Sequence, residues 1–211
     1  SLFQECPIPE NERIGQLGLF LSRQELSKLL FFNELYQKLV DVHGVFVEFG
    51  TRWGRNMALW NNLRGIYEPY NYNRKFVAFD TFDGFKGTDP KDGNHEILKE
   101  GYFGVTEAYE KYLSEVLRLH EKESPLGHIE KNCVLKGDAP IVLEKYLEDN
   151  PQTIVAFAWF DFDLYKPTLE CLKRIAPFLQ KGAIIGFDEL NDDIFPGETL
   201  AFREFFAGKS L

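Results

Sequence analysis

The sequence has 211 residues, and its hydrophobic content of 44% is enough to bury one sizeable core, so we expect residues 1–211 to form a single domain. Its 33 acidic residues outnumber its 24 basic residues, and the net charge of -9 leaves no general basic surface, which excludes nucleic acid as an expected partner. The three cysteines are widely spaced, no apolar run is long enough for a bilayer, and the first residues lack the order of a signal peptide, so we expect a cytoplasmic protein without a membrane partner.

The first predicted element is an amphipathic helix within residues 21–40, which ends a helical leader over residues 1–43. Ser22 and Glu25 form a capping-box pattern at its start, and leucines recur at helical spacing along it. These leucines, expected on the buried face, are Leu26, Leu29, Leu30, Leu35 and Leu39.

After this helix, short apolar runs alternate with amphipathic stretches. The runs predict strands at 45–50, 75–80, 132–138, 153–161 and 182–189, and the stretches predict helices at 57–63, 139–149 and 167–179. Strands that are apolar on both faces and separated by helices are typical of a parallel sheet covered on both sides. The predicted fold class is therefore α/β, with a doubly wound, mostly parallel sheet.

The alternation is interrupted by an insertion over residues 86–131. A polar loop with several glycines is followed by a predicted helix at 106–123, in which apolar residues recur at helical spacing. One interpretation is a helix packed on the surface; the other is a lid that closes over a ligand, since long loops in compact domains are often functional. The sequence leaves both open.

Acidic residues lie at the end of every predicted strand. They are Glu48, Asp80, Asp138, Asp161, Asp163, Asp188 and Glu189. Any one of them could cap a helix, but the carboxyl ends of parallel strands meet at one edge of a sheet, where ligands bind in such folds. The glycines of "EFGTRWG" are four apart, which departs from the spacing used for a dinucleotide pyrophosphate. An acid beside a glycine turn instead favours a ligand that is cationic or rich in hydrogen-bond donors.

Four segments carry a more specific resemblance: "VFVEFGTRWGRN", "FVAFDTFDGF", "VLKGDAP" and "FAWFDFDLYKPTLECLKRIAPFLQKGAIIGFDEL". Together they resemble the macrocin O-methyltransferase family of class I S-adenosylmethionine-dependent methyltransferases, which methylate sugar hydroxyls of natural products with a divalent metal. The resemblance runs from Val45 to Glu189 and implies a Rossmann-like core over residues 44–211. The family fold adds two further strands, which would follow Leu211.

The resemblance also implies a binding site for S-adenosylmethionine. It places Glu48, Gly50 and Gly54 around the methionine portion, Asp80 on the ribose hydroxyls and Asp138 near the adenine amine. Carboxylates accept hydrogen bonds from such donors. Thr51 and Gly137, next to these positions, are expected in the same site.

A divalent metal, most simply Mg²⁺, is the second expected cofactor. Asp161, Asp188 and Glu189 come from neighbouring strand ends, and clustered carboxylates repel one another unless a cation lies among them. Asp163 is the expected general base for a sugar hydroxyl, with His95 and His128 as the next candidates. The expected substrate is a small hydroxylated sugar, and the oligomeric state is left open between a monomer and a homo-oligomer.

Two other functions fit parts of the sequence. The D-x-D of "DFDLY" is also used by glycosyltransferases to hold a metal on a nucleotide-sugar, although the E-x-G-x-x-x-G strand would then have no role. A non-catalytic interaction domain would leave the strand-end acids as helix caps. A ligand of the native state raises the melting temperature, so the response to S-adenosylhomocysteine distinguishes an interaction domain from a methyltransferase.

Overall fold

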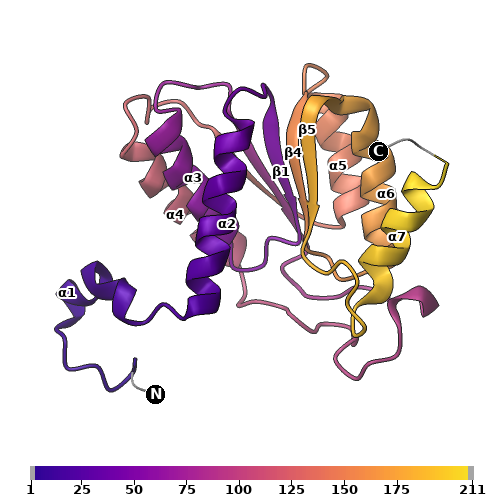
Figure 1. Ribbon diagram of the computed structural model, residues 1–211, viewed down its shortest axis with the longest axis horizontal. Coiled ribbons are helices and arrows are strands. Elements are labelled where there is room, and N and C mark those ends of the chain that lie inside the picture. The colour runs from indigo at the N-terminus through magenta and orange to yellow at the C-terminus, as the bar shows by residue number, and fades with distance from the viewer. Residues whose placement is uncertain (1–2, 209–211) are drawn as a thin grey trace.

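A computed structural model describes residues 3–208 and contains one five-stranded sheet with helices on both faces (Figure 1). The strands are β1 (Val45–Phe49), β2 (Phe76–Asp80), β3 (Asn132–Lys136), β4 (Val155–Phe160) and β5 (Leu179–Phe187). They are all parallel, in the order β3-β2-β1-β4-β5. The predicted doubly wound α/β class is therefore confirmed. Within residues 3–208, no helix is both long and apolar enough to cross a membrane.

The chain enters the sheet at its centre, in β1, and builds outward in both directions. It first adds β2 and β3 on one side and then returns to add β4 and β5 on the other. The connections after β1 and β4 therefore leave in opposite directions, which opens a crevice at the carboxyl ends of these two strands.

Helices cover the two faces of the sheet, as Figure 1 shows. One face carries α2 (Arg23–Leu39), α3 (Arg55–Tyr67) and α4 (Tyr109–Lys122), and the other carries α5 (Ala139–Asp149) and α6 (Tyr165–Ile175). Because side chains alternate along a strand, Phe46 of β1 points into the first core and Val47 into the second. Both strand faces are thus buried, which explains the continuous apolar runs in the sequence.

The buried face of α2 differs from the predicted one. Phe32, Tyr36 and Leu39 are buried, whereas Leu26 and Leu30 are 46% and 59% exposed. The prediction that all five leucines share the buried face was wrong, because aromatic side chains fill the space above the sheet: Phe32 packs edge-on against Trp60 and Trp159. Aromatic rings bury more apolar surface than leucine does, so packing Phe32 and Tyr36 against the sheet is the more stable orientation of α2.

The inserted segment divides into two parts. Helix α4 packs Leu113 and Leu117 into the core beneath it, which confirms a packed helix over residues 109–122. Residues 86–108 form a loop with one short turn of 3-10 helix, η2 (Pro90–Asp92). Only this loop remains as a candidate lid.

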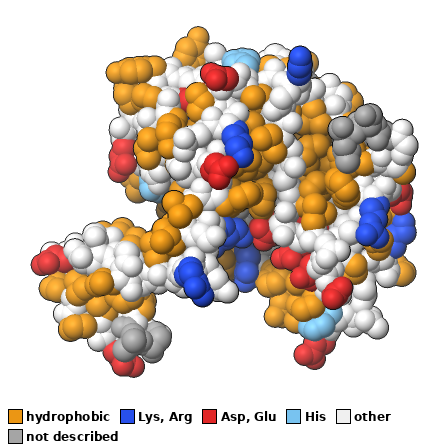
Figure 2. All heavy atoms as spheres, in the orientation of Figure 1, with side chains coloured by type: hydrophobic (Ala, Val, Ile, Leu, Met, Phe, Trp, Pro, Cys, Tyr) orange, Lys and Arg blue, Asp and Glu red, His pale blue; other side chains and the backbone are white. Residues whose placement is uncertain are grey.

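One helix lies outside the predicted elements, and two short helical segments lie within the predicted helical leader over residues 1–43. Helix α7 (Pro196–Phe206) follows β5 and packs on α6. Near the N-terminus, α1 (Glu10–Arg13) and the 3-10 helix η1 (Ile14–Leu19) form an arm that stands away from the sheet and carries exposed apolar side chains (Figures 1 and 2). Neither segment of this arm contains a buried residue.

Candidate functional site

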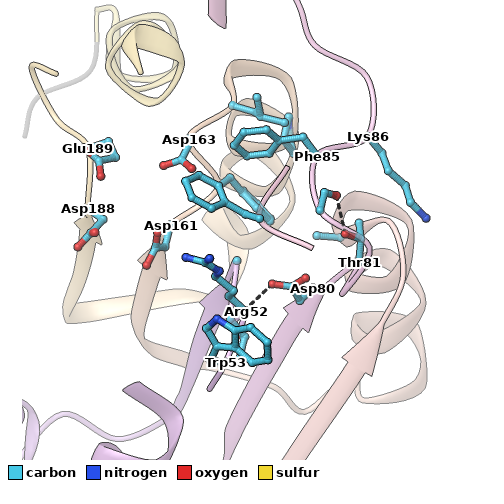
Figure 3. A pocket seen from close by; sticks show the side chains of 18 of the residues that line it. Arg52, Trp53, Asp80, Thr81, Phe85, Lys86, Asp161, Asp163, Asp188 and Glu189 are labelled. Carbon is cyan, nitrogen blue, oxygen red and sulfur yellow. Dashed lines mark hydrogen bonds between the residues drawn. The ribbon is translucent and has the colours of Figure 1, made fainter. Parts of the chain in front are cut away.

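A cavity of about 500 Å³ lies at the carboxyl ends of β1, β2, β4 and β5 (Figure 3). This volume is within the range of small-molecule and cofactor sites. Of the predicted site residues, nine line it: Gly50, Thr51, Asp80, Gly137, Asp138, Asp161, Asp163, Asp188 and Glu189. Glu48 and Gly54 lie outside the lining.

Asp80, at the end of β2, organises the loop that follows β1. Its two carboxylate oxygens accept hydrogen bonds from the backbone N–H groups of Arg52, at 2.6 Å, and Phe82, at 2.5 Å. Both donors belong to residues with positive φ, 48° and 57°, which non-glycine residues rarely adopt. Burial raises the pKa of Asp80, while these two bonds oppose the rise. The carboxylate is therefore a fixed acceptor on the cavity wall.

Glu48, on β1, is a buried acid with only part of its hydrogen-bonding capacity used. One oxygen accepts a bond from Asn56 Nδ2 at 2.8 Å, and the other has no partner among the described residues. The hydroxyl of Thr51, on the cavity wall, is also buried and unpartnered. Burial raises the pKa of Glu48 to about 8, and the nearby Asp161 and Asp80 add to the rise. Thr51 also lies close enough to Glu48 to oppose this rise, and of the two only Thr51 lines the cavity, where a ligand would reach its hydroxyl.

The two glycines of the turn after β1 serve different purposes. Gly50 has φ of 87°, and a Cβ there would overlap the carbonyl oxygen of Asp161, so glycine lets the ends of β1 and β4 approach closely. Gly54 has φ of 75° and begins α3, and a Cβ there would overlap the side chain of Leu113. Packing against α4 thus accounts for Gly54 without a ligand.

Four carboxylates face one another on the opposite wall (Figure 3). Asp161 and Asp163 follow β4, and Asp188 and Glu189 follow β5. Burial raises the pKa of Asp161 to about 7 and that of Asp163 to about 8, and the neighbouring acids raise both further. Burial and Asp188 also raise the pKa of Glu189. Because these carboxylates repel one another, the cluster favours either binding of a cation or protonation of some of its members.

Positive charge already lies beside this group: Lys28 and Arg55 lower the pKa of Asp161, and Arg52 lowers that of Asp163. Lys28 of α2 lines the cavity, and its Nζ lies 3.1 Å from Oδ1 of Asp188. Among residues 3–208, no three histidine, cysteine or acidic side chains are placed so that they could hold one metal ion. The donors are hard oxygen ligands suited to Mg²⁺, but their arrangement here is not a formed chelate.

Gly137 and Asp138 complete the wall on the β3 side. The N–H of Gly137 donates to the carbonyl of Asp80 at 2.9 Å, which holds the β3 loop against β2. Asp138 is exposed and precedes α5, but its side chain makes no capping hydrogen bond. Its carboxylate is therefore not occupied as a helix cap.

Solved structures similar to this chain are methyltransferases. A crystal structure of CalS11, a calicheamicin methyltransferase, is 43% identical with a TM-score of 0.93, covering 96% of this chain and 79% of that chain. The apo structure of CalS11, a TDP-rhamnose 3'-O-methyltransferase of calicheamicin biosynthesis, is 40% identical with a TM-score of 0.84, covering 96% and 80%. The chain belongs to the class I methyltransferase family.

A more distant methyltransferase shares the fold alone. The O-methyltransferase NovP is 19% identical with a TM-score of 0.61, covering 85% of this chain and 71% of that chain. A scan against protein-family models and a search of curated proteins find no match. The narrower macrocin O-methyltransferase resemblance stays a prediction. Membership of the class I methyltransferases supports a methyltransferase over the glycosyltransferase and the non-catalytic interaction domain.

Several residues of the methyltransferase cavity were not predicted. Arg52 lies over the ring of Phe103 at 4.6 Å, and Trp53 packs edge-on against Tyr109. These contacts join the β1 loop to the inserted segment and form an aromatic wall. Lys28 was also missed, because its contact with Asp188 spans 160 residues. No local sequence pattern signals such a contact.

The histidines named as alternative bases do not line the cavity of this methyltransferase. Both His95 and His128 are exposed. Asp163, which is buried against the cavity, is the better placed of the three candidates.

Proposed function

We propose that this chain transfers the methyl group of S-adenosylmethionine to a hydroxyl of a sugar, and that the sugar is carried on a nucleotide. One observation supports this most directly: a single cavity has the acceptor Asp80 on one wall and the cluster of Asp161 and Asp163 on the other, in a chain 43% identical to CalS11. The TDP-linked sugar in the description of CalS11 suggests the acceptor class.

In this proposal the β1 and β2 ends bind the methyl donor. Asp80 accepts from the ribose hydroxyls, and Asp138 accepts from the adenine amine. Thr51, which lines the cavity and has an unpartnered buried hydroxyl, lies on the methionine side with Gly50, and Glu48 is buried behind them. Gly137 allows close approach of the adenosine. The donor supplies a methyl group on a sulfonium, whose positive charge suits the acidic lining.

Asp163 is the proposed general base. As the sugar hydroxyl oxygen forms its bond to the methyl carbon, the carbon–sulfur bond of the donor breaks and the hydroxyl proton passes to the Asp163 carboxylate. With its pKa raised to about 8, the deprotonated form becomes dominant only above that pH in the protein alone. Positive charge near the cluster would lower this pKa and extend activity toward neutral pH.

A divalent cation held by Asp161, Asp188 and Glu189 is a separate part of the proposal. The type of ligand fits, but no chelate is formed among the described residues and Lys28 pairs with Asp188. When bound, such an ion lowers the pKa of a coordinated hydroxyl. The proposed role of Asp163 in proton transfer does not depend on it.

The test is methyl transfer from ¹³C-methyl-labelled S-adenosylmethionine to TDP-rhamnose and related nucleotide sugars, followed by NMR. We expect a labelled methyl ether, and we expect Asp163→Asn to slow its formation by about 100-fold or more. Asp83→Asn is the matched control, because Asp83 is exposed in a neighbouring loop and pairs with Lys86. Full activity of Asp163→Asn would refute the assignment of the base.

The same assay tests the metal. Activity should fall after treatment with EDTA and return when Mg²⁺ is added. Full activity in EDTA would remove the ion from the proposal and leave the methyl transfer itself intact.

A further inference from the structure

We infer that Glu198 is a positioning residue for the proposed reaction, because its carboxylate sets the backbone of the loop that carries Asp161 and Asp163. The inference rests on the proposed function only for its kinetic consequence. The arrangement itself is visible in hydrogen bonds that no local sequence pattern predicts.

The carboxylate of Glu198 joins the ends of two strands. One oxygen accepts hydrogen bonds from the N–H groups of Phe162, at 2.8 Å, and Asp163, at 3.3 Å. The other oxygen accepts from the N–H of Glu189, at 3.3 Å. A single side chain thus connects the loop after β4 to the loop after β5, and all four carboxylates of the cluster lie in these two loops.

The backbone that Glu198 holds is in an unfavourable conformation. Asp163 has φ of 62°, a left-handed conformation that non-glycine residues rarely adopt. Such a conformation persists only when surrounding contacts enforce it. The hydrogen bond to the Asp163 N–H is one of these contacts, and it determines the direction in which the Asp163 side chain leaves the backbone.

The start of α7 is shaped to bring Glu198 to this loop. A Cβ on Gly197 would lie 2.7 Å from the carbonyl oxygen of Asp163 and 2.6 Å from the N–H nitrogen of Tyr165, so only glycine permits this approach. Helix α7 is anchored by Ala201, which is buried against Leu169 of α6. Glu198 therefore projects from a fixed support.

A second buried acid holds the same loop from the inserted segment. Asp92 accepts a hydrogen bond from the N–H of Tyr165 at 2.5 Å with one oxygen and from the N–H of Asp89 at 2.6 Å with the other. Three N–H groups between Phe162 and Tyr165 are thus bound by two carboxylates from outside the sheet. Glu198 is the one that contacts Asp163.

Glu198 does not act on substrate directly. Its side chain is fully buried and does not line the cavity. Its effect must pass through the backbone of Asp163 and Glu189, so we expect it to change the rate of the chemical step more than the binding of the methyl donor, whose proposed contacts lie on the β1 and β2 ends.

The test compares Glu198→Gln, Glu198→Asp and Glu198→Ala with Glu170→Gln, a control on α6 whose carboxylate pairs with Arg174. Glutamine keeps one acceptor oxygen but turns an N–H donor toward a second N–H, and aspartate is one methylene too short. Amide hydrogen exchange by NMR is the first measurement and needs no activity. In Glu198→Ala, the amides of Phe162 and Asp163 should exchange about 10-fold faster or more, while Ala158 inside β4 should not change.

Steady-state kinetics is the second measurement. For Glu198→Gln, kcat should fall by about 10-fold to 100-fold, because a shift of the Asp163 carboxylate by about 1 Å is enough for such a loss. The KM for S-adenosylmethionine should stay near that of the wild type. Should Glu198→Ala not fold, the isosteric Glu198→Gln carries both measurements. Unchanged exchange at Phe162 and Asp163 overturns the inference, as does a loss of donor binding equal to the loss of kcat. Inactive wild-type protein with altered exchange in the variants would refute the proposed function and leave the arrangement of the loop intact.

Discussion

Glu48 shows how a single buried acid links the fold to the site. It lies on β1, just before the turn that reaches the cavity, and it is fully enclosed by the core. One oxygen is bonded to Asn56 and the other has no partner among the described residues. The protein therefore holds an incompletely satisfied acid in its centre, and this lowers the stability of the fold when the acid is ionised.

This cost should appear as a pH dependence of stability. Burial raises the pKa of Glu48 to about 8, so the folded protein binds this proton more tightly than the unfolded chain does. The free energy of unfolding should therefore fall as pH rises from about 4.5, the unfolded value, to about 8. Glu48→Gln keeps the acceptor for Asn56 and has no proton to lose, so it should be more stable than the wild type at pH 8 by a few kcal/mol, at about 1.4 kcal/mol per pKa unit.

Urea unfolding of the ligand-free protein at several pH values measures this difference. Glu148→Gln, which changes an exposed acid on α5, is the control and should follow the wild type. A constant difference between Glu48→Gln and the wild type from pH 5 to pH 8 would contradict the raised pKa.

At the residue scale, the sequence predicts the acids but not their partners. The positions of Asp80, Asp161 and Asp188 follow from strand ends, which apolar runs reveal. The hydrogen bonds that Asp80 accepts from two backbone N–H groups depend on positive φ at Arg52 and Phe82. Neither arginine nor phenylalanine is a residue type that predicts a positive φ. Glu198 is hidden for a similar reason, because its partners are backbone groups of two distant loops.

At the scale of elements, the loop over residues 86–108 is the part able to move. Helix α4 is fixed by Leu113 and Leu117 in the core, and η2 is fixed by the hydrogen bond that the N–H of Tyr165 donates to the Asp92 carboxylate. Between these fixed points lies a stretch in which Phe103 lines the cavity and packs under Arg52. This stretch, residues 93–108, includes Val105, which packs on the first core, and makes hydrogen bonds to the loop after β2, whereas no strand of the sheet is formed from it.

We expect residues 93–108 to close over bound ligands, because methyl transfer benefits from a site that excludes water and aligns donor and acceptor. Hydrogen exchange there should slow when S-adenosylhomocysteine and TDP-rhamnose are both present. The amides of α4, residues 109–122, serve as an internal reference and should change little. Equal rates in residues 93–108 with and without ligands would show that the loop is static.

Elements with a regular apolar pattern could be predicted, and those defined by distant contacts could not. All five strands lie within the predicted ranges or within a few residues of them. Helix α7 was missed because its buried residues include Gly197 and Glu198, whose burial comes from close approach to another loop and not from an apolar stripe. The predicted buried face of α2 was wrong, because the spacing of the leucines does not show which aromatic side chains fill the core above the sheet.

At the scale of the whole molecule, strand order explains why one edge of the sheet carries the site. The central β1 has β2 on one side and β4 on the other, so acids from both directions converge above it. This arrangement follows from a doubly wound sheet, and it was predictable once the strands were recognised. Strand order alone does not identify the family, because a fold of this kind serves many functions. The resemblance of four sequence segments predicted a class I methyltransferase, and the comparison with CalS11 confirmed it.

The most direct test of the account is calorimetric titration of the purified protein with S-adenosylhomocysteine. The account predicts saturable binding by the wild type and affinity weakened by about 10-fold or more in Asp80→Ala, because two donor hydroxyls lose their acceptor. Asp83→Ala, whose exposed carboxylate pairs with Lys86, should bind as the wild type does. Thermal melting of each variant confirms that it is folded. Absence of binding by the wild type, or equal affinity in folded Asp80→Ala, would contradict the account.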